Sequence, residues 1–104
     1  MKYDRRKYTR ITVDIPAALS LLQVDAYYSG AIGNLSAGGC FFPAGSELPL
    51  GAECNISITV GEGIRTEIFD LKGIVVRSDE MGVGIKFIDK TVEQMSIIMK
   101  KISH

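Results

Sequence analysis

The feature that most limits what this chain can fold into is a strict alternation of apolar and polar residues, which is typical of a strand with one buried face. The alternation is clearest over residues 54–60. Its apolar positions are Cys54, Ile56, Ile58 and Val60, and its polar positions are Asn55, Ser57 and Thr59. We therefore expect a half-buried strand here.

Segments before residue 54 also favour strands. Residues 11–22 (ITVDIPAALSLL) read as one long strand in which Pro16 produces a bend or bulge, because proline cannot donate to a β-ladder. Residues 27–35 (YYSGAIGNL) and 38–43 (GGCFFP) are shorter strand candidates that are interrupted by glycine and proline. The first half of the chain therefore predicts strands joined by tight corners.

Two segments after residue 60 are typical of a β-hairpin. Residues 66–78 and 82–88 are rich in β-branched and aromatic residues, and the sequence DEMG at 79–82 separates them. We expect these two segments to pair through that turn.

The last segment, residues 89–103, has the periodicity of an amphipathic helix. Its apolar residues recur at intervals of three and four and are Val92, Met95, Met99 and Ile102. Asp89 or Thr91 can cap its N-terminus, and Lys100 and Lys101 suit its C-terminal dipole. The whole pattern predicts a mainly β domain, namely five to seven strands in a small antiparallel barrel whose open end or side the helix covers.

Length and composition set further limits. A chain of 104 residues is long enough for one domain with its own core. It has no apolar run long enough for a membrane span and no signal-peptide pattern at its start, so we expect a cytoplasmic protein without membrane insertion. Cys40 and Cys54 lack CxxC spacing and nearby histidines, which favours buried free thiols.

The sequence offers little for catalysis. The single histidine is His104, the final residue, where a general base would not be held in place. The serines have no evident activating base, and Asp79 and Glu80 fall in the expected turn. No cluster has metal-ligand spacing. We therefore expect a binding protein, with no enzyme activity and no metal.

Charge is unevenly distributed although the formal net charge is zero. Residues 1–10 contain five basic residues and one acidic residue, a net charge of +4, so the remainder carries −4. Arg5, Arg6, Lys7 and Arg10 lie within the stretch RRKYTR. These cations either solubilise a terminal segment or bind an anion.

The stretch NLSAGG at residues 34–39 supplies a possible second half of an anion site. It combines an amide at Asn34 and a hydroxyl at Ser36 with Gly38 and Gly39, whose backbone a ligand can approach closely. Together the two stretches suit a planar, polyanionic ligand.

At these residues the sequence resembles the PilZ domain family. Arg6-x-x-x-Arg10 and Asn34-x-Ser36-x-x-Gly39 match the family signatures RxxxR and (D/N)xSxxG in the expected order, and LKGIVVRSDEMGVGIKF resembles its later hairpin. The resemblance covers essentially the whole chain and implies one domain: a flexible basic ligand-binding segment (1–10), a six-stranded antiparallel β-barrel (11–88) and a C-terminal helix (89–103).

The resemblance also implies a ligand, the bacterial second messenger cyclic di-GMP, and a role for each motif residue. Arg6 and Arg10 are expected to contact phosphate and the Hoogsteen edge of guanine, and can also stack on the base. Asn34 is expected to bind a guanine edge, and Ser36 a phosphate or an adjacent base. Gly39 would keep the surface free of a side chain where the ligand lies, and Gly38 would meet the needs of a turn with contact secondary.

Arg5 bears on the number of ligand molecules. In this family a long cationic side chain directly before RxxxR tends to accompany an intercalated pair of ligands, so the resemblance favours a dimeric ligand. The alternative is that Arg5 faces solvent.

Two other functions remain open from the sequence. One is a PilZ-fold adaptor that has lost nucleotide binding and acts through protein contacts, with Phe41, Phe42 and the helix as possible surfaces. The other is a small barrel that binds single-stranded nucleic acid, against which the zero net charge and the acidic remainder argue. A receptor with no attached output domain would pass its signal to a downstream protein that the sequence does not identify.

Overall fold

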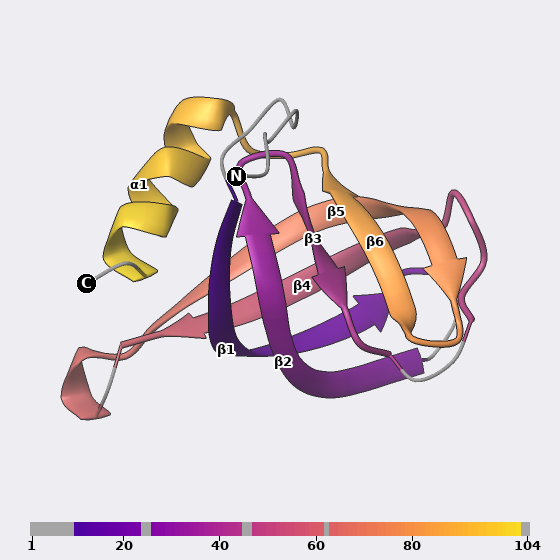
Figure 1. The fold of residues 1–104 in the computed structure, drawn as a ribbon, viewed down its shortest axis with the longest axis horizontal. Helices are drawn as coiled ribbons and strands as arrows, with labels where there is room; N and C mark the ends of the chain where they lie inside the picture. Colours follow the sequence, from indigo (N-terminus) through magenta and orange to yellow (C-terminus); the bar gives the residue numbers. More distant parts are fainter. Residues whose placement is uncertain (1–9, 24–25, 45–46, 62, 103–104) are drawn as a thin grey trace, which may run out of the picture.

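The structure is a computed structural model that describes residues 10–23, 26–44, 47–61 and 63–102, with residues 10–14 described through their backbone alone. The described residues form six strands, one 3-10 turn (η1) and one helix. Their bounds are β1 (Arg10–Leu21), β2 (Ala26–Ser36), β3 (Gly39–Phe42), β4 (Glu53–Val60), η1 (Gly63–Arg65), β5 (Glu67–Asp79), β6 (Gly82–Phe87) and α1 (Val92–Ile102). The strands close into an antiparallel barrel in the order β1-β2-β3-β6-β5-β4 (Figure 1), which confirms the predicted fold.

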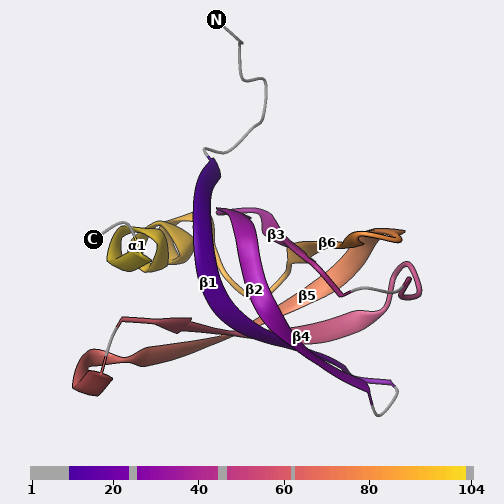
Figure 2. The same ribbon diagram turned by 60° about the horizontal axis from the view of Figure 1, so that its bottom comes forward.

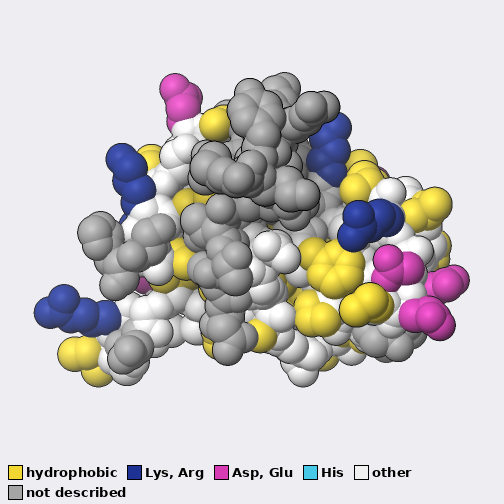
Figure 3. Space-filling model, viewed as in Figure 1, with side chains coloured by type: hydrophobic (Ala, Val, Ile, Leu, Met, Phe, Trp, Pro, Cys, Tyr) yellow, Lys and Arg dark blue, Asp and Glu magenta, His cyan; other side chains and the backbone are white. Residues whose placement is uncertain are grey.

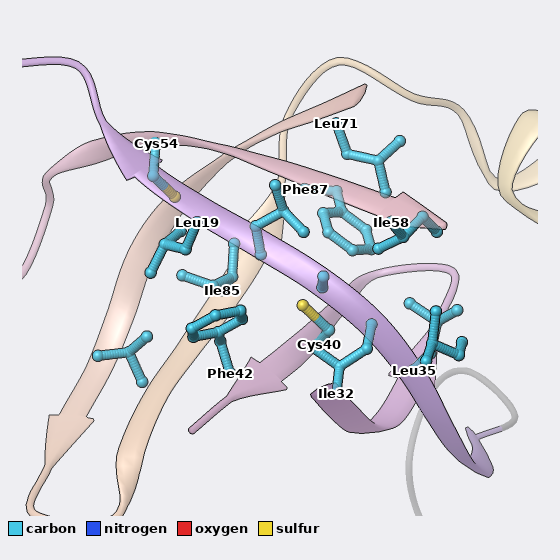
Figure 4. Packing of buried hydrophobic residues seen from close by; sticks show 14 of the residues in the cluster. Leu19, Ile32, Leu35, Cys40, Phe42, Cys54, Ile58, Leu71, Ile85 and Phe87 are labelled. Carbon is cyan, nitrogen blue, oxygen red and sulfur yellow. The ribbon is translucent and has the colours of Figure 1, made fainter. Parts of the chain in front are cut away.

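The barrel interior holds the core, and the alternating strands supply it. On β4 the predicted apolar face is buried from Cys54 to Val60, and the residues between are partly exposed. Leu19 and Ile32 from the first two strands and Phe42 from β3 are fully buried beside them (Figure 4). Each such side chain contributes about 1.5–3 kcal/mol by leaving water, so the barrel is held mainly by these interior faces.

β1 is a long strand that pairs with a different neighbour on each of its edges. Along its length it pairs with β2, and Ala17–Leu21 also pair with β4. Figure 2 shows the strand curving from the level of α1 to its contact with β4. Its register with β2 shifts between Thr12 and Ile15, so the irregularity lies just before Pro16, which itself stays in register opposite Ala31.

The predicted hairpin is formed by β5 and β6. Asp79 and Gly82 are partners at its end, and the Asp79 carboxylate accepts a hydrogen bond from the Met81 amide at 2.8 Å. That bond closes the turn, as Asp does in many tight turns.

The helix α1 begins with a capping box. Thr91 Oγ1 accepts a hydrogen bond from the Gln94 amide at 3.1 Å, and Gln94 Oε1 accepts one from the Thr91 amide at 2.9 Å. Thr91 therefore caps the helix. Asp89 instead accepts a hydrogen bond from the Lys72 amide at 3.1 Å and ties the approach to α1 to β5.

One face of α1 packs on the barrel. Met95 and Ile98 are buried, and Met99 and Ile102 pack against the core. Val92, which we expected on that face, is 46% exposed. Lys101 binds the Glu67 carboxylate at 3.2 Å, which places the end of α1 beside the start of β5 (Figure 1).

Candidate functional site

The two sequence motifs meet on neighbouring strands. In the antiparallel pairing of β1 and β2, Arg10 is the partner of Ser36 and Thr12 is the partner of Asn34. Directly paired positions lie about 4.5–5.5 Å apart between Cα atoms. The backbone therefore brings the last arginine of RxxxR next to the serine of NxSxxG.

Asn34 and Ser36 lie on the outer surface of the barrel. Leu35, between them, is fully buried, so the two polar side chains point the other way. Asn34 is exposed and Ser36 is half-buried at the end of β2. Of the described hydrogen bonds none engages the Asn34 amide, so its donors and acceptor face solvent and are open to a ligand.

The Ser36 hydroxyl already takes part in the turn between β2 and β3. Its oxygen accepts a hydrogen bond from the Gly38 amide at 3.2 Å, and its proton is donated to the Gly39 carbonyl at 3.3 Å. A hydroxyl has one proton and two lone pairs, so one lone pair remains. To donate to a phosphate oxygen, Ser36 must turn its proton away from Gly39, whose bond is long and weak.

Gly39 is required by the packing of the strands. A Cβ atom at this position would lie 2.0 Å from the carbonyl oxygen of Ile85 on β6. Gly39 is the partner of Lys86, and no side chain fits between the two strands here. We expected Gly39 to leave room for the ligand, and the structure adds a reason for the glycine that is independent of any ligand.

Gly38 lies in the bend that joins β2 to β3. Its carbonyl accepts a hydrogen bond from the Phe87 amide at 3.0 Å, which fastens the turn to β6. Among the described residues, those with positive φ are Gly51, Gly61, Gly63 and Gly82, so the conformation of Gly38 does not itself demand glycine. Gly38 thus has the turn role that we predicted, but it acts through the hydrogen bonds of its backbone amide and carbonyl.

The three arginines that we predicted as ligand-binding residues lie outside the part of the chain whose side chains are described. Arg5 and Arg6 precede the first described residue, and Arg10 is described through its backbone. The predicted contacts of these three arginines stay predictions.

The outer surface next to Asn34 holds residues that we did not predict as part of the site. Phe41 on β3 is the partner of Asn34, and the Arg77 guanidinium of β5 lies over the Phe41 ring, 5.7 Å from its centroid. Phe42 is fully buried, so it is no surface for a partner. In the sequence, Phe41 could have been noticed as an aromatic residue that closely follows the NxSxxG motif. Arg77 could not, because it comes from β5, which is far from the motif in the sequence.

The two cysteines are free and buried, as the sequence predicted. Burial, with a smaller effect of Cys54, raises the pKa of the Cys40 thiol to about 12, and burial raises the pKa of Cys54 to about 11. Both thiols are therefore protonated at neutral pH and are poor nucleophiles.

The described ranges contain no group of three or more His, Cys, Asp or Glu residues placed to hold a metal ion. His104 lies outside those ranges. None of the described helices is long and apolar enough to cross a membrane.

Comparisons with known proteins agree with this architecture. The family model described as the PilZ domain matches residues 4–103. Among solved structures, the PilZ domain of CeSA from a cellulose synthesizing bacterium has a TM-score of 0.68 at 17% identity, over 91% of this chain and 95% of that chain. The Bacillus subtilis inhibitor of motility, MotI/DgrA, has a TM-score of 0.69 at 16% identity, over 97% of this chain and 51% of that chain. At these identities the likeness concerns the fold. No curated protein matches the chain.

Proposed function

Because the chain belongs to the PilZ domain family, whose members are generally cyclic di-GMP receptors, we propose that it binds cyclic di-GMP in the cytoplasm and relays the signal to a protein partner. PilZ domains are typically non-catalytic receptor or adaptor domains, and the proposal includes no enzyme activity.

The observation that carries the proposal is the register of β1 and β2. Arg10 pairs with Ser36, so the backbones of two separate motifs are direct neighbours in the sheet, and Thr12 pairs with Asn34. An open amide at Asn34, a hydroxyl with a spare lone pair at Ser36 and a neighbouring arginine are groups that bind a guanine edge and a phosphate.

In this proposal Arg6 and Arg10 hold the ligand. A guanidinium offers paired N–H donors in a fixed plane, which fit two phosphate oxygens or the O6 and N7 atoms of guanine. Asn34 binds a guanine edge, Ser36 a phosphate or adjacent base, and the ligand lies over the turn that contains Gly38 and Gly39.

Arg5 determines the stoichiometry in the same proposal. A third guanidinium directly before RxxxR supplies the charge and the stacking plane for a second molecule, so we propose an intercalated ligand dimer. Calorimetry gives the number directly, and one ligand per chain would contradict the dimer while leaving the receptor function intact.

The first prediction tests the receptor function by calorimetry with cyclic di-GMP. We expect the wild-type protein to bind it, and to bind neither GMP nor a short single-stranded oligonucleotide with comparable affinity. Arg10→Ala should weaken binding about ten- to a hundredfold, because a hydrogen-bonded contact to a charged group is worth about 1.5–3 kcal/mol.

The matched control is Arg65→Ala. It removes the same side chain from η1, in the connection between β4 and β5 that projects away from the β2–β3 turn (Figures 1 and 2). Equal affinity of the Arg10 and Arg65 variants would remove Arg10 from the site. No binding by the wild-type protein would overturn the proposal, and tighter binding of the oligonucleotide would replace it with the nucleic-acid function.

One observation favours the adaptor as the second candidate. Both Ser36 and Gly39 are explained by the β2–β3 turn and the approach of β6 without any ligand. A PilZ-fold adaptor would keep these residues for folding, and the calorimetric experiment separates the two functions.

A further inference from the structure

We propose that the chain forms a reversible homodimer in which the β5 strands of two copies pair antiparallel through an open edge at Ile68 and Asp70. The edge belongs to the end of the β4–β5 hairpin that projects away from the β2–β3 turn (Figures 1 and 2). The inference therefore concerns an interaction surface outside both sequence motifs, and its partner is a second copy of this chain.

The first half of β5 has a neighbouring strand on one edge only. Residues 67–72 pair with β4, whereas the ladder with β6 begins at Gly73. The chain that leaves β6 still closes the edge at Lys72, whose carbonyl accepts a hydrogen bond from the Ile88 amide. The Lys72 amide in turn donates to the Asp89 carboxylate at 3.1 Å. The part of β5 before Lys72 is therefore an edge strand on its β6 side.

The backbone groups of Ile68 and Asp70 point out of this edge. The N–H and C=O groups of alternate residues in a strand face the same side, and those of Lys72 face the β6 side. No described residue forms a hydrogen bond with the N–H or C=O groups that Ile68 and Asp70 place on that side. Both side chains are exposed as well. The described structure therefore presents four backbone groups that a further strand can bind.

This edge lacks the usual protection of an open strand. Proteins block such edges with lysine, proline or a bulge that breaks the ladder. Residues 67–71 (EIFDL) contain no lysine or proline, and the register with β4 is regular along the whole hairpin. Ile68 is 65% exposed, and Ile64 in η1 is fully exposed. Figure 3 shows hydrophobic side chains at the lower left, where the hairpin ends in Figure 1.

The two acidic residues of the edge are engaged within the chain, so they oppose pairing less than free carboxylates would. The Glu67 carboxylate binds the Lys101 ammonium at 3.2 Å. The Asp70 carboxylate accepts a hydrogen bond from the Ser57 hydroxyl on β4. Repulsion between the edges of two copies is reduced accordingly.

Symmetry and packing leave one register for the pairing. In a two-fold symmetric antiparallel pair one residue lies on the axis, opposite its own copy. With Asp70 on the axis, two carboxylates would lie opposite each other. With Phe69 on the axis, the start of β5 would enter the place that Ile88 occupies beside Lys72 of the other copy. The axis therefore passes through Ile68.

In this register the two exposed isoleucines cover each other. Each Ile68 exchanges its N–H and C=O bonds with the other copy, and the Asp70 amide faces the partner's Thr66. Directly opposite side chains have their Cβ atoms about 4.5–5.5 Å apart, so the Ile68 side chains meet on the outer face and leave water.

The other face of the strand pair brings opposite charges together. Glu67 comes to lie opposite the partner's Phe69. In each copy the Lys101 ammonium lies 5.7 Å from the centroid of the Phe69 ring. The partner's Lys101 thus approaches Glu67, and the two copies attract each other at both ends of the paired segment.

The contact is short, so the dimer is weak. Stable interfaces bury about 1,200–2,000 Å² in total, and a few paired residues bury less. We expect association at high protein concentration and separation on dilution.

The second prediction tests the dimer by sedimentation velocity without cyclic di-GMP. The sedimentation coefficient of the wild type should rise between about 10 μM and about 1 mM, a range that covers weak interfaces. Ile68→Lys should remain a monomer, because it places two ammonium groups opposite each other on the axis. Met81→Lys is the matched control at a 77% exposed residue in the β5–β6 turn, and it should associate as the wild type does. Thermal unfolding checks that each variant is folded.

A second readout locates the contact by hydrogen exchange followed by NMR. The Ile68 and Asp70 amides should exchange about tenfold more slowly once about nine-tenths of the chains are paired. The Phe69 amide faces β4, so its exchange should not depend on concentration and serves as the internal control.

Three results would overturn the dimer: a wild-type sedimentation coefficient that stays constant, association of Ile68→Lys equal to that of the wild type, or exchange at Ile68 and Asp70 that ignores concentration. Because no ligand is present in either experiment, each of these results leaves the proposed receptor function standing. Failure of the wild type to bind cyclic di-GMP would likewise leave the dimer standing.

Discussion

Ser36 and Gly39 show how a binding motif can also be a folding motif. The Ser36 hydroxyl bridges the Gly38 amide and the Gly39 carbonyl, and Gly39 leaves the space that the Ile85 carbonyl occupies. A match to NxSxxG therefore indicates the turn at least as strongly as it indicates the ligand. Arg10 and Asn34, which have no such part in the described turn, are the more direct tests of binding.

The third prediction concerns Gly39→Ala. We expect the free energy of unfolding to fall by about 3 kcal/mol, because the new methyl group would overlap the backbone of β6 and force the strands apart. Urea denaturation of the ligand-free protein measures the loss.

Gly30→Ala is the matched control within the same sheet. A Cβ atom there would have only ordinary contacts, 3.9 Å to Phe42 and 4.0 Å to Pro43. Its stability should stay near the wild-type value. If both variants unfold at the same urea concentration, Gly39 is not a packing requirement.

At the scale of elements, the sequence predicted those strands and turns whose formation depends on a local pattern of residues. The alternation over 54–60 marked β4, and the turn residues at 79–82 marked the hairpin, because both signals lie within a few neighbouring residues. The sequence did not reveal that the ladder of β1 begins at Arg10, since this depends on the pairing with Ser36. The Arg77–Phe41 pair was equally hidden, because its residues lie on β5 and β3, which are far apart in the sequence and are brought together by β6.

The fourth prediction concerns the capping box of α1. Thr91→Ala should lower the free energy of unfolding by about 1 kcal/mol, because the Gln94 amide loses its acceptor. Ser96→Ala, an exposed position inside the helix, should not destabilise the protein. Chemical denaturation followed by circular dichroism measures both, and equal midpoints for Thr91→Ala and the wild type would show that the cap is dispensable.

At the scale of the whole molecule, the proposed site lies at the end of β1 where residues 1–9 join the barrel. Arg5 and Arg6 come from that segment, so a ligand that they share with Asn34 links it to the outer surface of β2. In the proposed function such a link changes the face that the domain presents to a partner, and this change is the signal that the partner receives.

The fifth prediction is that cyclic di-GMP slows amide exchange in residues 2–10. Hydrogen exchange with and without ligand measures the effect, and η1 (Gly63–Arg65), away from the site, is the internal control. Equal exchange of residues 2–10 in both states would contradict the proposed relay.

The strand order has a consequence for when the site can exist. β3, whose Gly39 belongs to the motif, is flanked by β2 on one side and by β6 on the other, and β6 is the last of the described strands. During synthesis both motifs emerge long before β6, but the Gly38 carbonyl has no Phe87 amide to accept from until that strand has docked. Closure of long-range pairs is slow compared with local structure. The β2–β3 turn of the proposed site is therefore complete only when β6 has paired with β3, and a nascent chain that displays both signatures before that pairing is still without it.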